Sequence, residues 1–206
     1  MFLEAAILAS SLSADALMAG FAYGSKKIKI PMLSLQIINF ICCAVIFIAI
    51  FFGGLLKPFL SENFAGAIAF VILFSIGTIK ILDGIIKSLI RKHTEKAFKF
   101  SVFNIQFILH LYANPEAADT DTSAHLSSSE AVFLAVPLSL DGMAVGFAAV
   151  FAGINPWALL AWSFAANTAA IFFGQKIGNS LAQKIPFNIS WLAGAALILL
   201  AFANLR

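Results

Sequence analysis

Residues 12–22 read LSADALMAGFA, and residues 138–148 read LSLDGMAVGFA. The two stretches agree at six of their eleven positions, and each places an aspartate, Asp15 or Asp141, inside an apolar run. A carboxylate in the hydrocarbon core of a bilayer is costly, and such residues commonly mark a path for ions or protons. Two of them at matching positions of a repeat predict one site that is built twice.

The chain around these stretches has the composition of a membrane protein. It is 61% hydrophobic and only 11% charged, with 22 Phe among 206 residues, whereas soluble domains carry about 25% charged residues. Apolar runs of about 18 residues or more are typical of transmembrane helices. Six such runs occur, at residues 2–23, 32–56, 64–86, 130–152, 156–179 and 187–205. We therefore expect an all-α polytopic membrane protein with six transmembrane helices, in contact with the lipid bilayer.

The first run is interpreted as a helix and not as a removable signal peptide. A signal peptide begins with basic residues, and the only early charge here is Glu4. The motif of the first run also recurs in the middle of the chain, where a signal peptidase would not act.

The distribution of Lys and Arg predicts the orientation in the membrane, since loops rich in these residues stay in the cytoplasm. One side of the six-helix plan collects most of them: Lys26, Lys27, Lys29, Lys87, Arg91, Lys92, Lys96, Lys99, Lys176 and Lys184. The other side has Lys57 and Arg206. We expect the basic side to be cytoplasmic and both termini to lie outside. The net charge of +3 is a topology signal here and indicates no nucleic-acid partner.

The repeat divides the chain into three parts. Residues 1–90 form a first three-helix repeat, residues 91–129 a polar cytoplasmic link, and residues 130–206 a second three-helix repeat. Three helices per half make the second half enter the membrane from the opposite side, so the repeats are inverted. In transporters with inverted repeats, the substrate site lies near the midplane, where the halves meet.

Asp15 and Asp141 are the first candidates for a cation site. Their depth excludes contact with an interface, because an aspartate side chain is too short to snorkel. The alternative is a structural one, in which each carboxyl is protonated or hydrogen-bonded and only fixes helix packing. Two carboxylates would suit a divalent cation, with further oxygen ligands nearby.

Four other polar residues complete the predicted cation pathway: Ser13, Ser139, Asn39 and Asn167. The serines precede the aspartates by two positions and therefore lie on a different face of the helix from the aspartates. They either line the edge of a cavity or bond back to a carbonyl of their own helix. The asparagines offer carbonyl oxygens to a hard ion, or they hydrogen-bond between helices.

Small residues follow each aspartate. Ala16 and Gly20, and likewise Gly142 and Gly146, lie four apart on one helix face, which lets another helix approach closely. We interpret them as helix-packing residues at the site, although packing without any site would use the same pattern. Further along the chain, Lys80 is three residues before Asp83, and we expect these two to pair along their helix.

The polar link contains a pattern of oxygen ligands that resembles a calcium loop. Its candidate ligands are Asp119, Asp121, Ser123, His125, Ser127 and Glu130. Ala124 replaces the turn glycine, so a Ca²⁺ site here would be degenerate. Independently, Ser127 and Glu130 form the pattern of a capping box that opens the fourth helix.

Residues 98–112, which precede that loop, alternate apolar and polar side chains, as one face of a strand would. Basic residues lie just upstream, and we expect this segment to lie on the inner leaflet of the membrane. The chain contains no nucleophile elbow, phosphate loop or paired His-Glu metal motif, so the sequence does not indicate an enzyme.

The doubled Ser-x-Asp-x-x-x-x-Gly motif, the three-plus-three plan and residues 77–84 (GTIKILDG) resemble the MntP-type manganese efflux pumps. Residues 115–123 (PEAADTDTS), followed by Glu130, resemble more closely the YtaF-type sporulation membrane proteins of endospore-forming bacteria, a branch of the same superfamily. The resemblance covers essentially the whole chain. It implies a protein of the bacterial cytoplasmic membrane that is related to divalent-cation exporters, in which Asp15 and Asp141 match the family's intramembrane aspartates.

One departure from the family leaves two functions open. The efflux pumps carry an acidic residue in their second helix, where this chain has Asn39, Cys42 and Cys43 but no carboxylate. The paired aspartates favour a secondary transporter for a divalent cation such as Mn²⁺. The missing carboxylate favours a non-transporting membrane protein required for sporulation.

Overall fold

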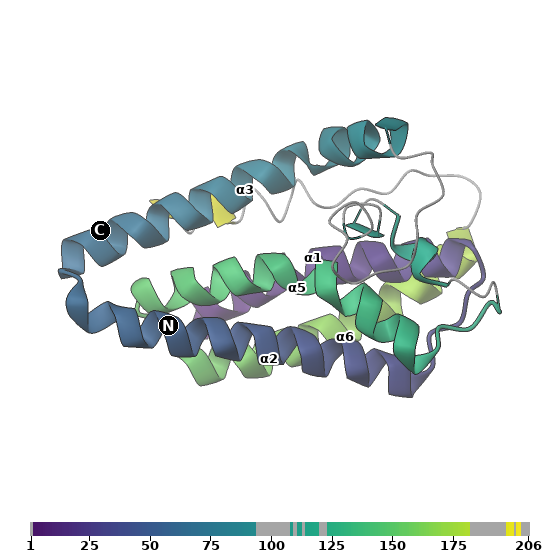
Figure 1. Ribbon diagram of the computed structural model, residues 1–206, viewed down its shortest axis with the longest axis horizontal. Coiled ribbons are helices and arrows are strands. Elements are labelled where there is room, and N and C mark those ends of the chain that lie inside the picture. The colour runs from purple at the N-terminus through teal and green to yellow at the C-terminus, as the bar shows by residue number, and fades with distance from the viewer. Residues whose placement is uncertain are drawn as a thin grey trace.

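The computed structural model of the protein (Figure 1) describes residues 2–93, 108, 111–112, 114–119, 123–181, 197–199 and 201–202. The five long helices are α1 (Phe2–Ser25), α2 (Met32–Leu56), α3 (Glu62–His93), α5 (Ser128–Phe151) and α6 (Pro156–Leu181). Two short 3₁₀ helices, η1 (Lys57–Phe59) and η2 (Pro115–Ala118), lie between α2 and α3 and between α3 and α5 along the chain. No strand occurs within it, apart from one isolated bridge between Lys29 and His125. The all-α prediction is confirmed.

Five of these helices contain segments that are long and apolar enough to cross a membrane. The segments are Leu3–Ser25, Met32–Phe59, Phe64–Leu82, Ser128–Phe151 and Pro156–Ser180. They correspond to the first five runs predicted from sequence, and the chain is a multi-pass membrane protein. The sixth predicted run, 187–205, falls mostly outside the described residues, although 197–199 and 201–202 are helical. Phe202 packs there against α3, with its ring centre 5.3 Å from that of Phe70.

Large apolar side chains on the outside of the bundle agree with a lipid environment. Phe40 and Trp157 are each 73% exposed, and Phe51 is 56% exposed. In water, such a surface would be a strong aggregation hazard, whereas in a bilayer it lies against acyl chains. These aromatic residues therefore contact lipid.

The helices pack as two close pairs, α1 with α6 and α2 with α5, and α3 lies along α5 at one side of the bundle (Figure 1). Helices α1 and α5 run antiparallel. Leu8, early in α1, shares a buried cluster with Ala149 near the end of α5. Tyr23, late in α1, shares another with Ala131 near the start of α5. The midpoints of α1 and α5 therefore lie at the same level of the bundle.

Helices α1 and α5 end in the same local structure. After α5, the N–H groups of Gly153 and Ile154 donate to the carbonyls of Val150 and Ala149, which is a Schellman motif with Gly153 at φ 72°. After α1, the N–H groups of Lys27 and Ile28 donate to the carbonyls of Gly24 and Tyr23 in the same pattern. Lys27 takes the left-handed position there at φ 60°, a conformation that usually favours glycine.

The start of α5 is fixed by the predicted capping box. Ser127 is the N-cap, and its side chain accepts from the Glu130 N–H, while the Glu130 carboxylate accepts from the Ser127 N–H at 3.0 Å. The cap satisfies donors that a helix start leaves open. This prediction is confirmed.

Of residues 98–112, for which sequence alternation suggested a strand face on the membrane surface, the structure describes Ile108, Leu111 and Tyr112. All three are helical, and Leu111 is buried. The rest of the segment lies outside the described residues.

Candidate functional site

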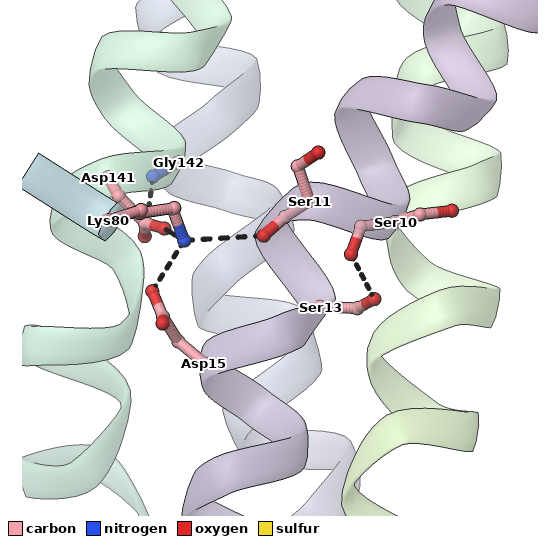
Figure 2. Close-up of polar contacts among 7 residues, drawn as sticks. All are labelled: Ser10, Ser11, Ser13, Asp15, Lys80, Asp141 and Gly142. Atoms are coloured by element: carbon pink, nitrogen blue, oxygen red, sulfur yellow. Dashed lines mark hydrogen bonds and ion pairs between the residues drawn. The ribbon is translucent and has the colours of Figure 1, made fainter. Parts of the chain in front are cut away.

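Lys80 of α3 lies between the two repeat aspartates (Figure 2). Its Nζ is 2.7 Å from Asp15 Oδ2 and 2.9 Å from Asp141 Oδ2, and it donates a hydrogen bond of 3.2 Å to the Ser11 carbonyl. The ammonium thus donates hydrogen bonds to Asp15 and to the Ser11 carbonyl and forms an ion pair with Asp141. Asp141 Oδ1 in turn accepts from the Gly142 N–H at 2.9 Å. One ammonium therefore joins α1, α3 and α5.

The three charges are almost completely withdrawn from the surface of the protein. The side chains of Lys80, Asp15 and Asp141 are 4%, 14% and 19% exposed. Two carboxylates and one ammonium carry a net charge of −1 in their ionised forms. Buried charges are tolerated only when they are paired and hydrogen-bonded, and removing one partner commonly costs about 3–5 kcal/mol. In this cluster, the two carboxylates share one cation, which is the ammonium group of Lys80.

The sequence places the aspartates at this point through helix direction. Asp15 is near the middle of α1 and Asp141 near the middle of α5, and the two helices run antiparallel, so equivalent midpoints meet. The structure brings the two predicted residues to the same ammonium. The two aspartates meet because α1 and α5 have the same length, 24 residues each, and pack antiparallel.

Lys80 was missed as a member of the site. The sequence suggested a pair with Asp83 one helical turn away, whose side chain lies outside the described part of the structure. The described partners of the ammonium are Asp15, Asp141 and the Ser11 carbonyl. The available signal was the position of Lys80 inside the membrane-crossing segment Phe64–Leu82. A lysine at that depth requires an anionic partner, and the two repeat aspartates were the acidic residues predicted to lie at midplane depth.

Ser13 and Ser139 behave alike. Each hydroxyl donates to the carbonyl three residues earlier in its own helix, Ser13 to Ser10 at 2.9 Å and Ser139 to Val136 at 2.8 Å. This was one of the two roles expected of them. Ser139 also borders a small internal cavity.

That cavity lies beside the charged cluster, between α1, α2, α5 and α6. Ala16 and Gly142, the residues that follow the two aspartates, line it together with Ser139, Cys42 and Asn167. Its volume is about 10 Å³, which is room for about one water molecule.

The two asparagines have different environments. Asn39 of α2 donates to the Thr168 hydroxyl of α6 at 2.6 Å, which is the interhelical hydrogen bond expected as an alternative role. Asn167 borders the cavity. Oδ1 of each is buried and has no hydrogen-bond donor among the described residues. Both therefore offer an unused carbonyl oxygen, of the kind that binds hard cations.

The small residues make close helix contacts. A Cβ built on Gly20 would lie 2.5 Å from the Ile171 carbonyl of α6, and one on Gly146 would lie 2.9 Å from Ala49 of α2. Gly24, Gly174 and Gly178 make equally close backbone contacts across the α1–α6 interface. The predicted packing residues therefore lie at both helix pairs, with Gly142 facing Ile46 beside the cavity.

The calcium-loop pattern forms a different local structure where the structure describes it. Glu130 Oε2 accepts from the Ser127 N–H and, at 2.8 Å, from the Ser127 hydroxyl, so this carboxylate caps α5. Ser123 bonds to the His125 backbone, and Ala124 takes the left-handed conformation at φ 59°. Asp121 lies outside the described residues, and those described contain no group of three or more His, Cys, Asp or Glu that could hold a metal ion. Calcium binding by Asp119 and its neighbours stays a prediction.

Comparison with known proteins identifies the family to which the chain belongs. Residues 60–205 match the Mntp family, described as "Putative manganese efflux pump". The chain belongs to the Mntp family. This membership confirms the resemblance seen in the sequence, and it places the chain among transport proteins rather than enzymes, as expected.

One curated relative matches nearly the whole Mntp-family chain. "Probable sporulation protein YtaF" of Bacillus subtilis (strain 168) is 28% identical over 199 residues, which is 93% of each chain. No solved structure matches. Lys80 and Asp141 both fall within the part of the chain that matches the Mntp family, and the match to the relative extends over a still larger share of the chain.

Proposed function

We propose that this chain is a secondary transporter that exports a divalent cation of the Mn²⁺ type across the bacterial cytoplasmic membrane. Asp15 and Asp141 are the ion ligands in this proposal. The observation that carries it is the position of the Lys80 ammonium, held at 2.7 and 2.9 Å by carboxylates from two different helices. A site that holds an ammonium at membrane depth has the charge and the oxygen donors that a metal cation needs.

The charges suggest how the site works. Two carboxylates neutralise one divalent ion, which makes its passage through the membrane electrostatically feasible. The ion and a charged Lys80 would repel each other at this separation, so binding requires that the ammonium leaves the two carboxylates. Lys80 then substitutes for the ion when the site is empty, and it keeps two buried carboxylates from facing each other without a counter-charge.

The ligand chemistry suits manganese. Carboxylate, carbonyl and water oxygens are the ligands typical of Mg²⁺, Ca²⁺ and Mn²⁺. Asn39 and Asn167 add buried carbonyl oxygens that lack hydrogen-bond donors among the described residues, and Asn167 borders the cavity next to Gly142. The membership of the Mntp family supports manganese as the substrate.

The architecture supports alternating access. Helices α1 and α5 run antiparallel, carry their aspartates at equal depth and end in the same Schellman motif. The pair α1–α6 corresponds to the pair α5–α2 if the halves are related by a two-fold axis in the membrane plane. Such inverted repeats rock around a midplane site in transporters. We infer that the chain has six helices in two inverted repeats, with both termini outside.

A second candidate is a non-transporting membrane protein required for sporulation. Two observations favour it. Lys80 already pairs with both aspartates, and the second helix has Asn39, Cys42 and Cys43 but no carboxylate of the kind that the efflux pumps carry there. The name of the Bacillus relative also indicates sporulation. In this case the charged cluster only fixes α1, α3 and α5 to one another.

The experiment that separates the candidates measures the manganese content of cells that lack their own exporter. The wild-type chain is compared with Asp15→Asn/Asp141→Asn at equal membrane abundance. Lys57→Gln is the matched control, because Lys57 also bonds a helix carbonyl, that of Val150, but at the far end of α2. Export predicts a lower manganese content with wild type and Lys57→Gln, and no lowering with the double variant.

If neither wild type nor any variant changes the manganese content, manganese export by this chain is excluded. Sporulation efficiency in a strain lacking its own relative then tests the second candidate. Sporulation that is restored by wild type without any change in manganese content supports the scaffold, and the double asparagine variant should then be impaired through lost stability, because Lys80 keeps a buried charge without a carboxylate partner.

A further inference from the structure

A basic pocket of about 750 Å³ lies where α1 ends, α2 begins and α6 ends. Lys27, Lys29 and Lys176 line it, and His125, Gln175 and Asn179 add further polar groups. None of the lining residues is acidic, and none of the three lysines forms an ion pair with a residue that the structure describes. Among the described residues, the pocket is therefore a concave site whose positive charge no acidic side chain of its lining compensates, which suits an anion.

The pocket lies at the border of the apolar part of the protein. The membrane-crossing segments end at Ser25, begin at Met32 and end at Ser180, all within a few residues of the lysines. Phe172 lines the same pocket one helical turn before Lys176 and is 50% exposed, and Met32 is 66% exposed. Positive charge and lipid-facing apolar surface thus occur side by side, at the level where phospholipid headgroups meet their acyl chains.

The walls of the pocket are held in place by hydrogen bonds between distant segments. Gln175 Nε2 of α6 donates to the Ile28 carbonyl at 3.0 Å. The Lys29 N–H donates to the Ala124 carbonyl at 2.8 Å, and the Leu126 N–H donates to the Lys29 carbonyl at 2.9 Å. The backbone that carries Lys27 and Lys29 is therefore fixed before any ligand arrives, which reduces the ordering cost of binding.

We propose that this pocket binds the phosphate of an anionic phospholipid such as phosphatidylglycerol. The phosphate lies among the three ammonium groups, and an acyl chain runs along Phe172 toward the membrane interior. Basic pockets between transmembrane helices are known to bind anionic headgroups. A free phosphate ion would satisfy the lysines equally well, but it would leave the apolar wall unused. The site is independent of the aspartates and of the transport proposal.

The test uses the full chain, purified in a mild detergent and freed of lipid. Native mass spectrometry measures the affinity for phosphatidylglycerol and for phosphatidylcholine, with and without inorganic phosphate as a competitor. The variant is Lys27→Gln/Lys29→Gln/Lys176→Gln, and Lys57→Gln at the other end of the bundle is the control. A basic residue near the membrane surface contributes about 1 kcal/mol, so each substitution should weaken phosphatidylglycerol binding about fivefold.

Preferential binding of phosphatidylglycerol to wild type and Lys57→Gln, lost in the triple variant and resistant to phosphate, supports the proposal. Equal binding of both lipids overturns it, and so does an unchanged affinity of the triple variant. Complete competition by inorganic phosphate also overturns it, because the ligand would then be a soluble anion. Single substitutions of each lysine cover the case in which the triple variant does not fold.

Discussion

At the scale of single residues, Lys80 decides the properties of the membrane centre. It donates hydrogen bonds to Asp15 and to the Ser11 carbonyl, it forms an ion pair with Asp141, and its side chain is 4% exposed. A lysine in this position has two consequences that can be separated. It stabilises the ion-free protein, and it competes with a metal ion for the same carboxylates.

Replacing Lys80 tests both consequences. We expect Lys80→Gln to lower the stability of the ion-free protein by about 3–5 kcal/mol, since two buried carboxylates lose their counter-charge. We expect Mn²⁺ to restore more stability to this variant than to wild type, because the ammonium no longer occupies the site. The melting midpoint in detergent, recorded over a Mn²⁺ titration, measures both effects.

Lys57→Gln is the control. Its melting midpoint should respond to Mn²⁺ no more strongly than that of wild type. If Lys80→Gln melts like wild type without metal, the buried ion pairs contribute little to stability. If it loses stability but gains none from Mn²⁺, the cluster is a structural one and the scaffold function is favoured.

Sequence reasoning identified part of this cluster, and the reason for the limit is physical. The repeat identified Asp15 and Asp141, because a duplicated motif can be recognised from the sequence alone. Lys80 has no counterpart in the second half, and its partners lie 65 and 61 residues away in the chain. Its local neighbour Asp83 was therefore the obvious partner, although depth in the membrane required a search for charges elsewhere.

At the scale of helices, close packing holds the site together. The glycines of α1 and α6 contact each other's backbone in a reciprocal pattern: a Cβ on Gly20 would meet Ile171, and one on Gly174 would meet Leu17. The sequence predicted the small residues that follow the aspartates. It did not predict Gly24, Gly174 and Gly178, because the partner and register of a helix depend on the whole bundle.

Substitution at this interface should separate the helices. In Gly174→Ala, the added Cβ would overlap the Leu17 carbonyl, so α1 and α6 must move apart. Overpacking commonly costs about 1–3 kcal/mol, and backbone atoms cannot rotate away. We expect a lower melting midpoint and a smaller folded fraction by fluorescence-detected gel filtration.

Gly54→Ala is the matched control, because no atom lies within 4 Å of a Cβ built at Gly54. Alanine is a better helix former than glycine by about 1 kcal/mol, so this variant should be as stable as wild type or slightly more stable. If both variants melt alike, the α1–α6 contact is looser than the structure indicates.

At the scale of the whole molecule, charge distinguishes the two ends of the bundle. Lys26, Lys27 and Lys29 follow α1, and Lys176 lies in the last turns of α6, whereas Lys57 begins η1 at the opposite end of α2. Short loops rich in lysine stay in the cytoplasm, so we expect the end with the basic pocket to face inward. An exporter in this orientation takes its ion from the side of the basic pocket.

Single-cysteine labelling tests the orientation. In a Cys42→Ala/Cys43→Ala background, we expect Lys29→Cys to react with a membrane-impermeant maleimide only after the cells are permeabilised. Ser61→Cys, in the exposed connection between η1 and α3, should react in intact cells. The opposite labelling pattern would reverse the topology, and the three lysines of the pocket would then face the outer leaflet. It would also reverse the expected direction of transport, because the ion would enter from outside. The wild-type background, with Cys42 buried and Cys43 partly buried within α2, serves to show that the reagent does not reach the membrane interior.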